Sequence, residues 1–211
     1  GKNCNIFFFF LISAPPQDLK YNGEETTVEI GNNTTIRECA TIHKGTSDRM
    51  KTVIGKNCLI MAYCHIAHDC IVGNNCIFSN NSTLAGHVTI GENVILAGLV
   101  AVHQFVSIGN HAFVTGGSLV RKDVPPYVKA AREPLSYVGI NSVGLRRRGF
   151  TSEKIRDIQN IYRILYQKHY NNSQAVQIIE AEMEATPERD EILQFIRDSQ
   201  RGIMKGYFSA N

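Results

Sequence analysis

Four of the seven histidines in this chain, together with two of their neighbours, could carry out acid–base chemistry. His68 can act as a general base near neutral pH, and the adjacent Asp69 could orient or charge-stabilise a neighbouring imidazole. Gly86 stands eighteen residues after His68, and its backbone N–H could stabilise an oxyanion without a side chain in the way. A base beside an oxyanion donor suits acyl transfer, which requires a fold that places residues eighteen apart next to each other.

The segment from Ile54 to Val120 has a period that meets this requirement. An aliphatic or aromatic residue returns there at every sixth position: Ile54, Ile60, Ile66, Val72, Phe78, Leu84, Ile90, Leu96, Val102, Ile108, Val114 and Val120. A glycine follows every third member of this series, so the full unit is eighteen residues. A period of six fits neither a helix nor an extended strand and is typical of a parallel β-helix of hexapeptide repeats. Three short strands per turn then form a triangular prism.

Residues eighteen apart stack in such a prism at about the 4.8 Å spacing between strands. Once a six-residue loop is allowed for, three adjacent columns form a strip: His43, Ala67, Ala85 and His103; Lys44, His68, Gly86 and Gln104; and Gly45, Asp69, His87 and Phe105. Four successive coils therefore each contribute a histidine to the strip. The strip contains no Ser or Cys, which favours direct transfer from a thioester to a substrate hydroxyl over a covalent intermediate. His65 has no stacked polar partner in this alignment and is either structural or accessory.

The six-residue spacing of apolar residues also extends from Ile54 towards the N-terminus as far as Ile6, with two interruptions. The distance between successive glycines predicts a short loop near residues 45–51 and a longer one near residues 13–25, where Pro15, Pro16, Asn22 and Gly23 favour turns. The run Phe7 to Phe10 fits the pattern poorly, because Phe10 occupies a slot that elsewhere holds small residues.

After Val120 the period stops at Asp123, Pro125 and Pro126, and helical patterns take over. Thr151 is expected to cap a first helix, Ser173 a second, and Thr186 with Pro187 a third. The apolar faces of these helices are predicted to be Ile155, Ile158, Tyr162 and Leu165; Ala175, Ile178 and Ile179; and Ile192, Leu193 and Ile196. The predicted division is a β-helix over residues 1–126, a connecting segment over 127–150, and a C-terminal helical domain over 151–211.

Bulk composition indicates a soluble, cytoplasmic enzyme. The 211 residues, 43% hydrophobic and 19% charged, suffice for one domain with an appendage. A net charge of +3 is too small to indicate nucleic-acid binding. The longest apolar run, from Ile6 to Ile12, is too short to span a bilayer and lacks the flanks of a signal peptide, so stable membrane insertion is not expected.

The six cysteines are expected to form neither disulfides nor a zinc site. Five of them lie two residues before an apolar hexad position, in a slot that elsewhere holds Ala, Ser or Val: Cys4, Cys58, Cys64, Cys70 and Cys76. Cysteine is therefore predicted to act there as a small buried apolar residue. Only Cys39 lies outside this pattern.

Seven motifs occur in order along the chain: Gln17-Asp18-Leu19-Lys20-Tyr21, Thr41-Ile42-His43-Lys44-Gly45-Thr46, His65-Ile66-Ala67-His68-Asp69-Cys70, Ala85-Gly86-His87-Val88, Ala101-Val102-His103-Gln104-Phe105, Asp123-Val124-Pro125-Pro126-Tyr127 and Arg147-Arg148-Gly149-Phe150. Together they resemble the UDP-N-acetylglucosamine O-acyltransferase family of lipid A biosynthesis over nearly the whole chain. The resemblance implies an all-β left-handed parallel β-helix with a C-terminal α-helical domain, in a homotrimer with active sites between subunits. It implies transfer of a (3R)-3-hydroxyacyl group from acyl carrier protein to the 3-hydroxyl of UDP-N-acetylglucosamine, without metal or cofactor.

The resemblance also implies residue roles. His68 would be the general base, Asp69 its partner and Gly86 the oxyanion donor. The other residues expected to line the substrate site are Lys20, His43, His65, His87 and His103, and, towards the sugar nucleotide, Gln17, Asp18, Gln104, Asn141, Arg147 and Arg148. On sequence alone the alternative for the two arginines is a solvated basic face, which is the less favoured of the two interpretations. Val143 stands where some relatives carry glutamate, which leaves one nucleotide contact open, and family members usually begin with further coils, so the chain looks truncated at its N-terminus.

Three further expectations concern surfaces. A flat prism face is too shallow to enclose a substrate, so a second subunit is expected to supply the other wall. The stretch from Arg146 to Lys168 holds seven basic and two acidic residues and is a candidate docking surface for acidic acyl carrier protein. Gly116 is expected to line the far part of an acyl cleft and to leave it open for a chain of about fourteen carbons or more, since about 13 Å of prism separates it from His68.

Three alternatives stay open at this level. The sister enzyme that N-acylates a UDP-linked glucosamine shares the fold, although the segment Gln17 to Tyr21 and the long helical tail argue against it. A trimeric β-helix zinc carbonic anhydrase also draws histidines from neighbouring coils. A non-catalytic β-helix binding module would not require the histidine strip.

Overall fold

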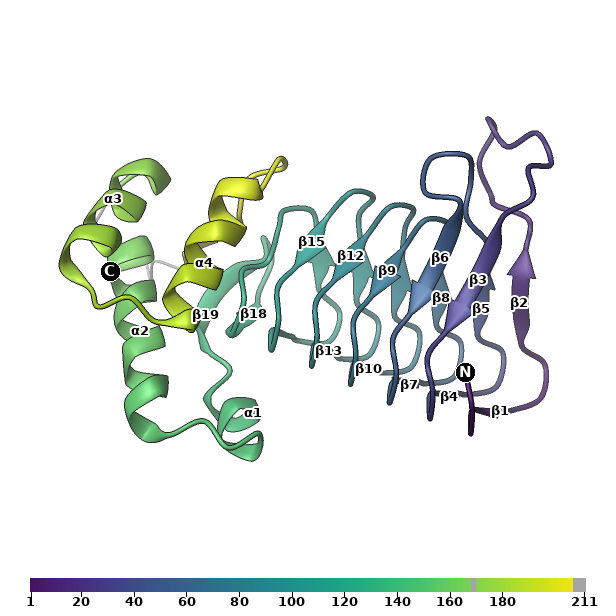
Figure 1. Cartoon of the computed structure of the whole chain (residues 1–211), viewed down its shortest axis with the longest axis horizontal. Helices are drawn as coiled ribbons and strands as arrows, with labels where there is room; N and C mark the ends of the chain where they lie inside the picture. The colour runs from purple at the N-terminus through teal and green to yellow at the C-terminus, as the bar shows by residue number, and fades with distance from the viewer. Residues whose placement is uncertain (168–169, 207–211) are drawn as a thin grey trace.

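The computed structural model describes residues 1–167 and 170–206, and it shows a parallel β-helix with helices at one end (Figure 1). Three sheets form the sides of the prism. Sheet A contains β1 (Asn5–Ile6), β4 (Thr35–Ile36), β7 (Leu59–Ile60), β10 (Ile77–Phe78), β13 (Ile95–Leu96) and β16 (Phe113–Val114). Sheet B contains β2 (Leu11–Ala14), β5 (Thr41–His43), β8 (His65–Ile66), β11 (Thr83–Leu84), β14 (Ala101–Val102) and β17 (Leu119–Val120). Sheet C contains β3 (Thr27–Ile30), β6 (Lys51–Ile54), β9 (Ile71–Val72), β12 (Thr89–Ile90) and β15 (Ser107–Ile108).

The chain visits the sheets in the order A, B, C, so each coil has an A–B, a B–C and a C–A corner. All twelve apolar residues of the six-residue series point into the prism and are at most 3% exposed. Each contributes about 1.5–3 kcal/mol through burial of a large apolar side chain. The predicted parallel β-helix is confirmed, and stacking of the coils supplies its core.

Glycine recurs at the C–A corner because coils approach each other there too closely for a side chain. A Cβ on Gly55 would lie 2.6 Å from the carbonyl carbon of Gly73, and a Cβ on Gly73 would lie 2.7 Å from that of Gly91. The eighteen-residue spacing of glycine therefore follows from backbone contact between successive coils.

The cysteine slot is buried, as predicted, except at Cys4 in the first coil, which is partly exposed, and all six cysteines are free thiols. Cys58, Cys64, Cys70 and Cys76 are at most 2% exposed. Each thiol also donates a hydrogen bond to a carbonyl of the next coil; the Cys70 Sγ, for example, lies 3.2 Å from the Ala85 oxygen. Ser82, in the same slot, donates to the Ala97 oxygen over 3.1 Å. The slot therefore selects small residues and also accommodates a donor, which explains why both Cys and Ser occur there.

Both predicted loops are present, and both leave the B–C corner. The longer loop connects β2, which ends at Ala14, with β3, which begins at Thr27, and the shorter loop connects β5 with β6. In the first coil the run Phe7 to Phe10 turns outward at the A–B corner, with Phe8 83% and Phe9 88% exposed. Phe10 is half exposed and does not fill the buried slot of its register.

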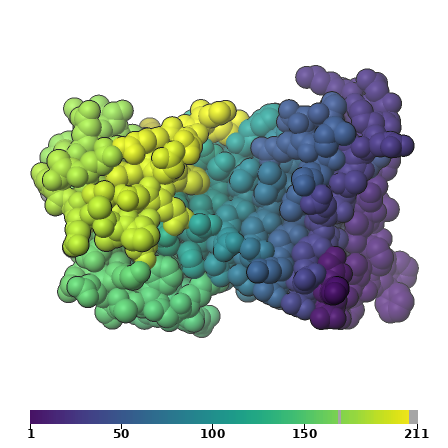
Figure 2. Space-filling view, viewed as in Figure 1, coloured from purple at the N-terminus to yellow at the C-terminus, as the bar shows by residue number. Residues whose placement is uncertain are grey.

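Sheet A continues past residue 126 through strands that the sequence did not predict. β18 (Val128–Ala131) pairs with β16, β19 (Ser136–Ile140) runs antiparallel to β18, and β20 (Lys205–Gly206) completes the sheet. A short helix, α1 (Ser142–Arg147), was also not predicted. Figure 2 shows the helical tail against the last coils, at the opposite end from the first coils.

Three longer helices follow: α2 (Ser152–Gln167), α3 (Asn172–Glu182) and α4 (Pro187–Asp198). Thr151 accepts the Lys154 N–H at the start of α2, and Thr186 caps α4 with Pro187 in its first turn, as expected. The predicted cap of α3 was wrong, because Asn171 forms a capping box with Gln174 two residues before Ser173. None of the helices in the described residues combines the length and the apolar character that crossing a bilayer requires.

The predicted apolar faces of these helices are buried, with two exceptions. Ile178 of α3 and Ile196 of α4 remain partly exposed. The hydroxyl of Tyr162 donates to the Pro126 oxygen over 2.6 Å and anchors α2 on the end of the prism. The aromatic ring of Tyr137 on β19 stacks on both Tyr162 and Tyr166, so α2 packs on sheet A.

Candidate active site

The strand register stacks the histidine strip as the period predicts. Thr41 pairs with His65, His65 with Thr83, and Thr83 with Ala101, so the turns that follow these strands lie one above another at the B–C corner. The ring of His68 meets that of His87 edge-on at 5.0 Å, and His87 stacks on Phe105 at 4.6 Å. The strip therefore contains a row of contacting rings, from His68 to Phe105, along one corner of the prism.

His68 and Asp69 form a hydrogen-bonded pair. His68 Nδ1 lies 2.8 Å from Asp69 Oδ2, and the Asp69 side chain is completely buried while that of His68 is 12% exposed. An ionised carboxylate can only accept, so this bond places the proton on Nδ1 and leaves Nε2 able to take a proton. Burial alone would raise the pKa of the Asp69 carboxyl, but hydrogen bonds from His68, Thr46 and Arg49 together hold the pKa below its usual value.

Gly86 lies directly against the His68 imidazole. A Cβ at this position would stand 2.6 Å from His68 Cε1 and 2.7 Å from Nε2, so no side chain fits between the coils here. Among the described residues no acceptor takes the Gly86 N–H, whereas the Gly86 oxygen accepts from Phe105. The base nitrogen of His68 and an unused backbone donor therefore lie side by side.

His87 lies between two carboxylates. Its Nδ1 is 3.1 Å from Asp48 Oδ2, without the geometry of a hydrogen bond, and its Nε2 is 3.9 Å from Asp69 Oδ2. Asp48 belongs to the loop between β5 and β6 and is exposed. His87 thus connects this loop to the row of rings.

His43 and His65 form the lower end of the row, with ring centres 4.9 Å apart. Burial, followed by the charges of His65 and His68, lowers the pKa of His43, and burial and His68 lower that of His65. Burial thus favours the neutral form of both rings. The expectation that His65 lacks a stacked polar partner was wrong, because Thr41 Oγ1, one coil below, lies 2.7 Å from its Nδ1.

The loop between β2 and β3 emerges at the same corner, and Lys44 holds it. Lys44 Nζ donates to the Glu24 oxygen over 3.3 Å and lies 5.2 Å from the ring centre of Tyr21. Gln17 and Lys20 are exposed, and Asp18 accepts the Lys20 N–H over 3.0 Å. These side chains, which the sequence placed in the site, thus lie on a loop fastened beside the strip.

His103 and Gln104 occupy the top of the strip. Both side chains are exposed, and His103 Nδ1 donates to the Gln104 carbonyl oxygen over 3.1 Å. They lie one coil above Ala85 and Gly86, as the columns predict.

The remaining predicted site residues lie elsewhere on the same subunit. Gly116 is at the A–B corner, one coil above Gly98. A Cβ on Gly116 would lie 3.0 Å from the backbone oxygen of Gly98. Arg147 is exposed and lines a cavity of about 420 Å³ with Lys129 and Val143 over the outer face of sheet A. Within one chain, these residues and the histidine strip do not converge.

Asn141 and Arg148 have structural partners. The Asn141 side chain accepts the Gly144 N–H at the start of α1 and donates to the His111 oxygen over 2.9 Å. Arg148 donates to Asn93 Oδ1 over 3.0 Å and to the Gly144 oxygen over 3.1 Å. Both residues fix α1 to the C–A corner of the prism.

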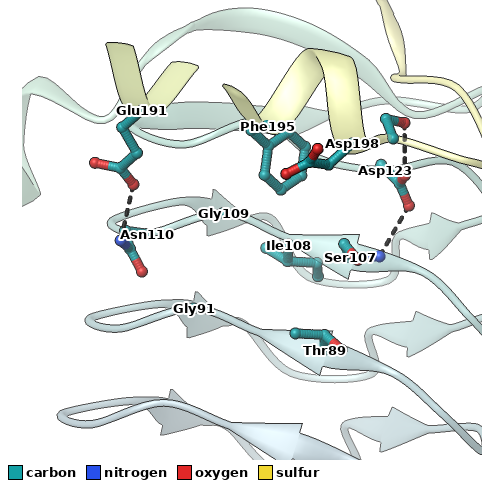
Figure 3. Close-up of a pocket in the computed structure, with 11 residues that line it drawn as sticks. Thr89, Gly91, Ser107, Ile108, Gly109, Asn110, Asp123, Glu191, Phe195 and Asp198 are labelled. Carbon is teal, nitrogen blue, oxygen red and sulfur yellow. Dashed lines mark hydrogen bonds between the residues drawn. The ribbon is translucent and has the colours of Figure 1, made fainter. Parts of the chain in front are cut away.

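A well-formed cavity of about 290 Å³ lies away from the strip, between sheet C and α4 (Figure 3). Asn110 donates to Glu191 over 2.8 Å on one side, and Asp123 accepts from Ser107 and Ser199 on the other. Burial raises the pKa of the Glu191 carboxyl. The histidine strip lies outside this cavity, and its members His87 and Phe105 line a separate cavity of about 200 Å³ together with Arg49 and Asp123.

The strip also contains a set of potential metal ligands. The ligand atoms of His68, Asp69 and His87 lie within 4.8 Å of one another. Both oxygens of Asp69, however, already accept two hydrogen bonds each, from His68 and from the loop between β5 and β6. A cation would have to displace these donors, so the arrangement suits a base and its carboxylate partner better than a resident metal.

Comparison with known proteins relates the whole chain to one group of enzymes. A family profile described as Udp N-acetylglucosamine O-acyltransferase; Domain 2 matches residues 123–204, and one described as Bacterial transferase hexapeptide (six repeats) matches residues 51–86. The chain is 46% identical over 206 residues to the acyl-[acyl-carrier-protein]–UDP-N-acetylglucosamine O-acyltransferase of Myxococcus xanthus. The alignment covers 97% of this chain and 80% of that protein. It is similar to the crystal structure of a UDP-N-acetylglucosamine acyltransferase from Bacteroides fragilis, with a TM-score of 0.93 and 46% identity over 96% of this chain and 84% of that one.

Proposed function

The chain belongs to the UDP-N-acetylglucosamine O-acyltransferase family, and from this premise we propose how its residues carry out the reaction. The enzyme transfers an acyl group from acyl carrier protein to UDP-N-acetylglucosamine in lipid A biosynthesis. We further propose that the transferred acyl group is a (3R)-3-hydroxyacyl chain and that the acceptor is the 3-hydroxyl of the sugar.

His68 is the general base of this proposal. Its Nε2 removes the proton from the sugar hydroxyl as the oxygen attacks the thioester carbonyl, and Asp69 stabilises the imidazolium that forms. The negative charge on the carbonyl oxygen is stabilised by the Gly86 N–H. The intermediate then collapses, the C–S bond breaks, and the imidazolium gives its proton to the departing thiolate of the carrier, so no covalent enzyme intermediate is needed.

The observation that carries this proposal is the contact between Gly86 and the imidazole of His68. A Cβ would lie only 2.7 Å from Nε2, so the base and the N–H beside it have room for a reacting carbonyl only because residue 86 is glycine. Asp69 fixes the ring from the opposite side through Nδ1. None of these three residues belongs to the apolar core of the prism.

The active enzyme of this proposal is a homotrimer. On four successive coils the outward side chain of sheet A is large and apolar, namely Leu59, Ile77, Ile95 and Phe113, whereas β12 and β15 of sheet C present Thr89 and Ser107. A surface of this kind favours contact with another copy. If sheet A of one subunit covers the strip of the next, Arg147 reaches a substrate that the strip of a single chain cannot enclose. An active monomer in analytical ultracentrifugation would contradict this arrangement.

The acyl carrier protein is proposed to dock on α2 and its surroundings. Arg163 on α2 lines a polar cavity of about 430 Å³ together with Arg132 and Gln159. Arg156 is exposed on the same helix. Cations at such a surface would accelerate encounter with an acidic carrier.

Product analysis with 3-hydroxyacyl carrier protein and UDP-N-acetylglucosamine tests the proposal, since an ester at the 3-hydroxyl is expected and an amide on a UDP-linked glucosamine is not. His68→Ala should lower kcat by about 10² to 10⁴, the typical contribution of a general base, without loss of folding. Near-normal turnover of this variant would refute the role given to His68.

A further inference from the structure

The short loop between β5 and β6, residues 44–50, covers the buried carboxylate of Asp69. Thr46 N–H donates to Asp69 Oδ1 over 2.9 Å, and Thr46 Oγ1 donates to Oδ2 over 2.7 Å. The Arg49 N–H donates to Oδ1 over 3.2 Å. The loop therefore supplies three of the four hydrogen bonds to this carboxylate, and His68 supplies the fourth.

Thr46 contacts the same oxygen that holds the base. Asp69 Oδ2 accepts both from His68 Nδ1 and from the Thr46 hydroxyl, and Thr46 is 6% exposed. The hydroxyl oxygen itself accepts the Asp48 N–H over 3.3 Å, which directs its one proton towards Asp69. The position of the His68 ring thus depends on a carboxylate whose own orientation is set by the loop.

We propose that Thr46 is a positioning residue for acyl transfer, which orients the Asp69 carboxylate and keeps it ionised so that it can hold His68. The inference rests on the proposed role of His68 as general base. Asp69 takes a left-handed backbone conformation, with φ of 58°, because it occupies a corner of the prism. Three of the four hydrogen bonds that hold its side chain come from outside its own coil.

The loop has a separate anchor, so Thr46 is not needed to close it. The Arg49 guanidinium donates to the Asp69 backbone oxygen over 2.8 Å and reaches Thr89 Oγ1 over 3.5 Å. These bonds and the Thr46 N–H remain when the Thr46 hydroxyl is removed. Removal of the hydroxyl takes away one of the donors that lower the pKa of Asp69, whereas the burial that raises this pKa is unchanged.

Other charged or titratable groups surround the pair, but none replaces the hydroxyl. These groups are Lys44, Asp48, Arg49, His43, His65 and His87. The Arg49 guanidinium is engaged with the Asp69 backbone, and His87 Nε2 is 3.9 Å from Oδ2, beyond hydrogen-bond reach. Asp48 faces His87, and Lys44 faces Glu24 on the other loop.

The test compares Thr46→Val, which lacks the hydroxyl, with Thr46→Ser, which keeps it. We expect Thr46→Val to lower kcat by about tenfold with unchanged KM for both substrates. The acidic limb of its kcat profile should move to higher pH by on the order of one unit, the size that a lost charge-assisted hydrogen bond corresponds to. The direction follows because the His68–Asp69 pair, with a less stabilised carboxylate, takes up its proton at higher pH and then lacks a neutral base. Thr46→Ser should restore both the rate and the profile.

Thr34→Val is a matched control, because Thr34 is also fully buried and its hydroxyl bonds to the Gly55 oxygen and the Cys58 N–H at the C–A corner. It should lower Tm without moving the pH profile. A parental pH profile in Thr46→Val, or no rescue by Thr46→Ser, overturns the inference. If Thr46→Val and Thr46→Ala both fail to fold while Thr46→Ser folds, the hydroxyl serves folding and the positioning role is rejected.

The same experiments separate this inference from the proposed function. Turnover that survives His68→Ala removes the base assignment itself. An inactive His68→Ala beside a parental pH profile in Thr46→Val removes only the role given to Thr46.

Discussion

Replacing Gly86 with alanine should displace the base without unfolding the protein. The new Cβ would stand 2.6 Å from His68 Cε1, against about 3.4 Å or more for ordinary contact, so the ring must move by roughly 1 Å. The atoms it meets are the far end of a side chain, which can rotate away at little cost in stability. The rotation would, however, break the 2.8 Å bond from His68 Nδ1 to Asp69.

A misplacement of about 1 Å in an active site costs on the order of 10²-fold in rate. At 1.36 kcal/mol per factor of ten this is about 2.7 kcal/mol of lost transition-state stabilisation. We therefore expect kcat of Gly86→Ala to fall by about 10² with little change in Tm, measured with 3-hydroxyacyl carrier protein and UDP-N-acetylglucosamine.

A double-mutant cycle shows whether the loss acts through His68. In a His68→Ala background the added methyl has no ring to displace, so the combined loss should be smaller than the product of the two single losses. A normal kcat for Gly86→Ala, or losses that simply multiply, would refute the reasoning.

Three further predictions concern the carrier, the acyl chain and pH. Reversing Arg156 and Arg163 to glutamate should raise KM for acyl carrier protein more than KM for the UDP-sugar, and equal effects would indicate another docking site. Gly116→Met should shift the acyl-chain length with the highest kcat/KM, measured across a series of carrier thioesters, from about fourteen carbons or more to a shorter chain, because overpacking an apolar site costs about 1–3 kcal/mol. An unchanged optimum would place the length determinant elsewhere. Burial lowers the folded-state pKa of His43 and His65, so the unfolded chain binds more protons than the folded chain at pH values just below the usual histidine pKa of about 6.5. Tm should therefore fall as pH drops through this range, and it should fall less in His43→Gln.

The sequence predicted the prism and its columns because each coil repeats the same local solution. An apolar side chain points inward at every sixth residue, and parallel register fixes what lies above it. The predicted alignment of His68 under Gly86 follows from that register alone. The contact between Thr41 and His65 follows from the same register, because the two residues pair on adjacent coils.

The C-terminal part was less predictable because its elements depend on partners distant in sequence. β18 and β20 are short strands that pair only because sheet A ends beside them. The start of α3 was misplaced because Asn and Ser are both good N-caps, and the reciprocal bond to Gln174 decides in favour of Asn171. Periodicity carries no information about either choice.

The most informative signal in the sequence is where the period fails. Both interruptions leave the prism at the B–C corner, which is the corner that carries the histidines. A loop inserted at a corner leaves the inward-pointing residues of the coil in place, so the core tolerates it at a small entropic cost. One loop presents Gln17 and Lys20 beside the strip, and the other places Thr46 on the Asp69 carboxylate. The repeat therefore builds a rigid row of stacked positions, and the loops outside the repeat add the residues that complete a site on part of that row. For this reason the periodicity predicted the position of the base but not the residue that orients it.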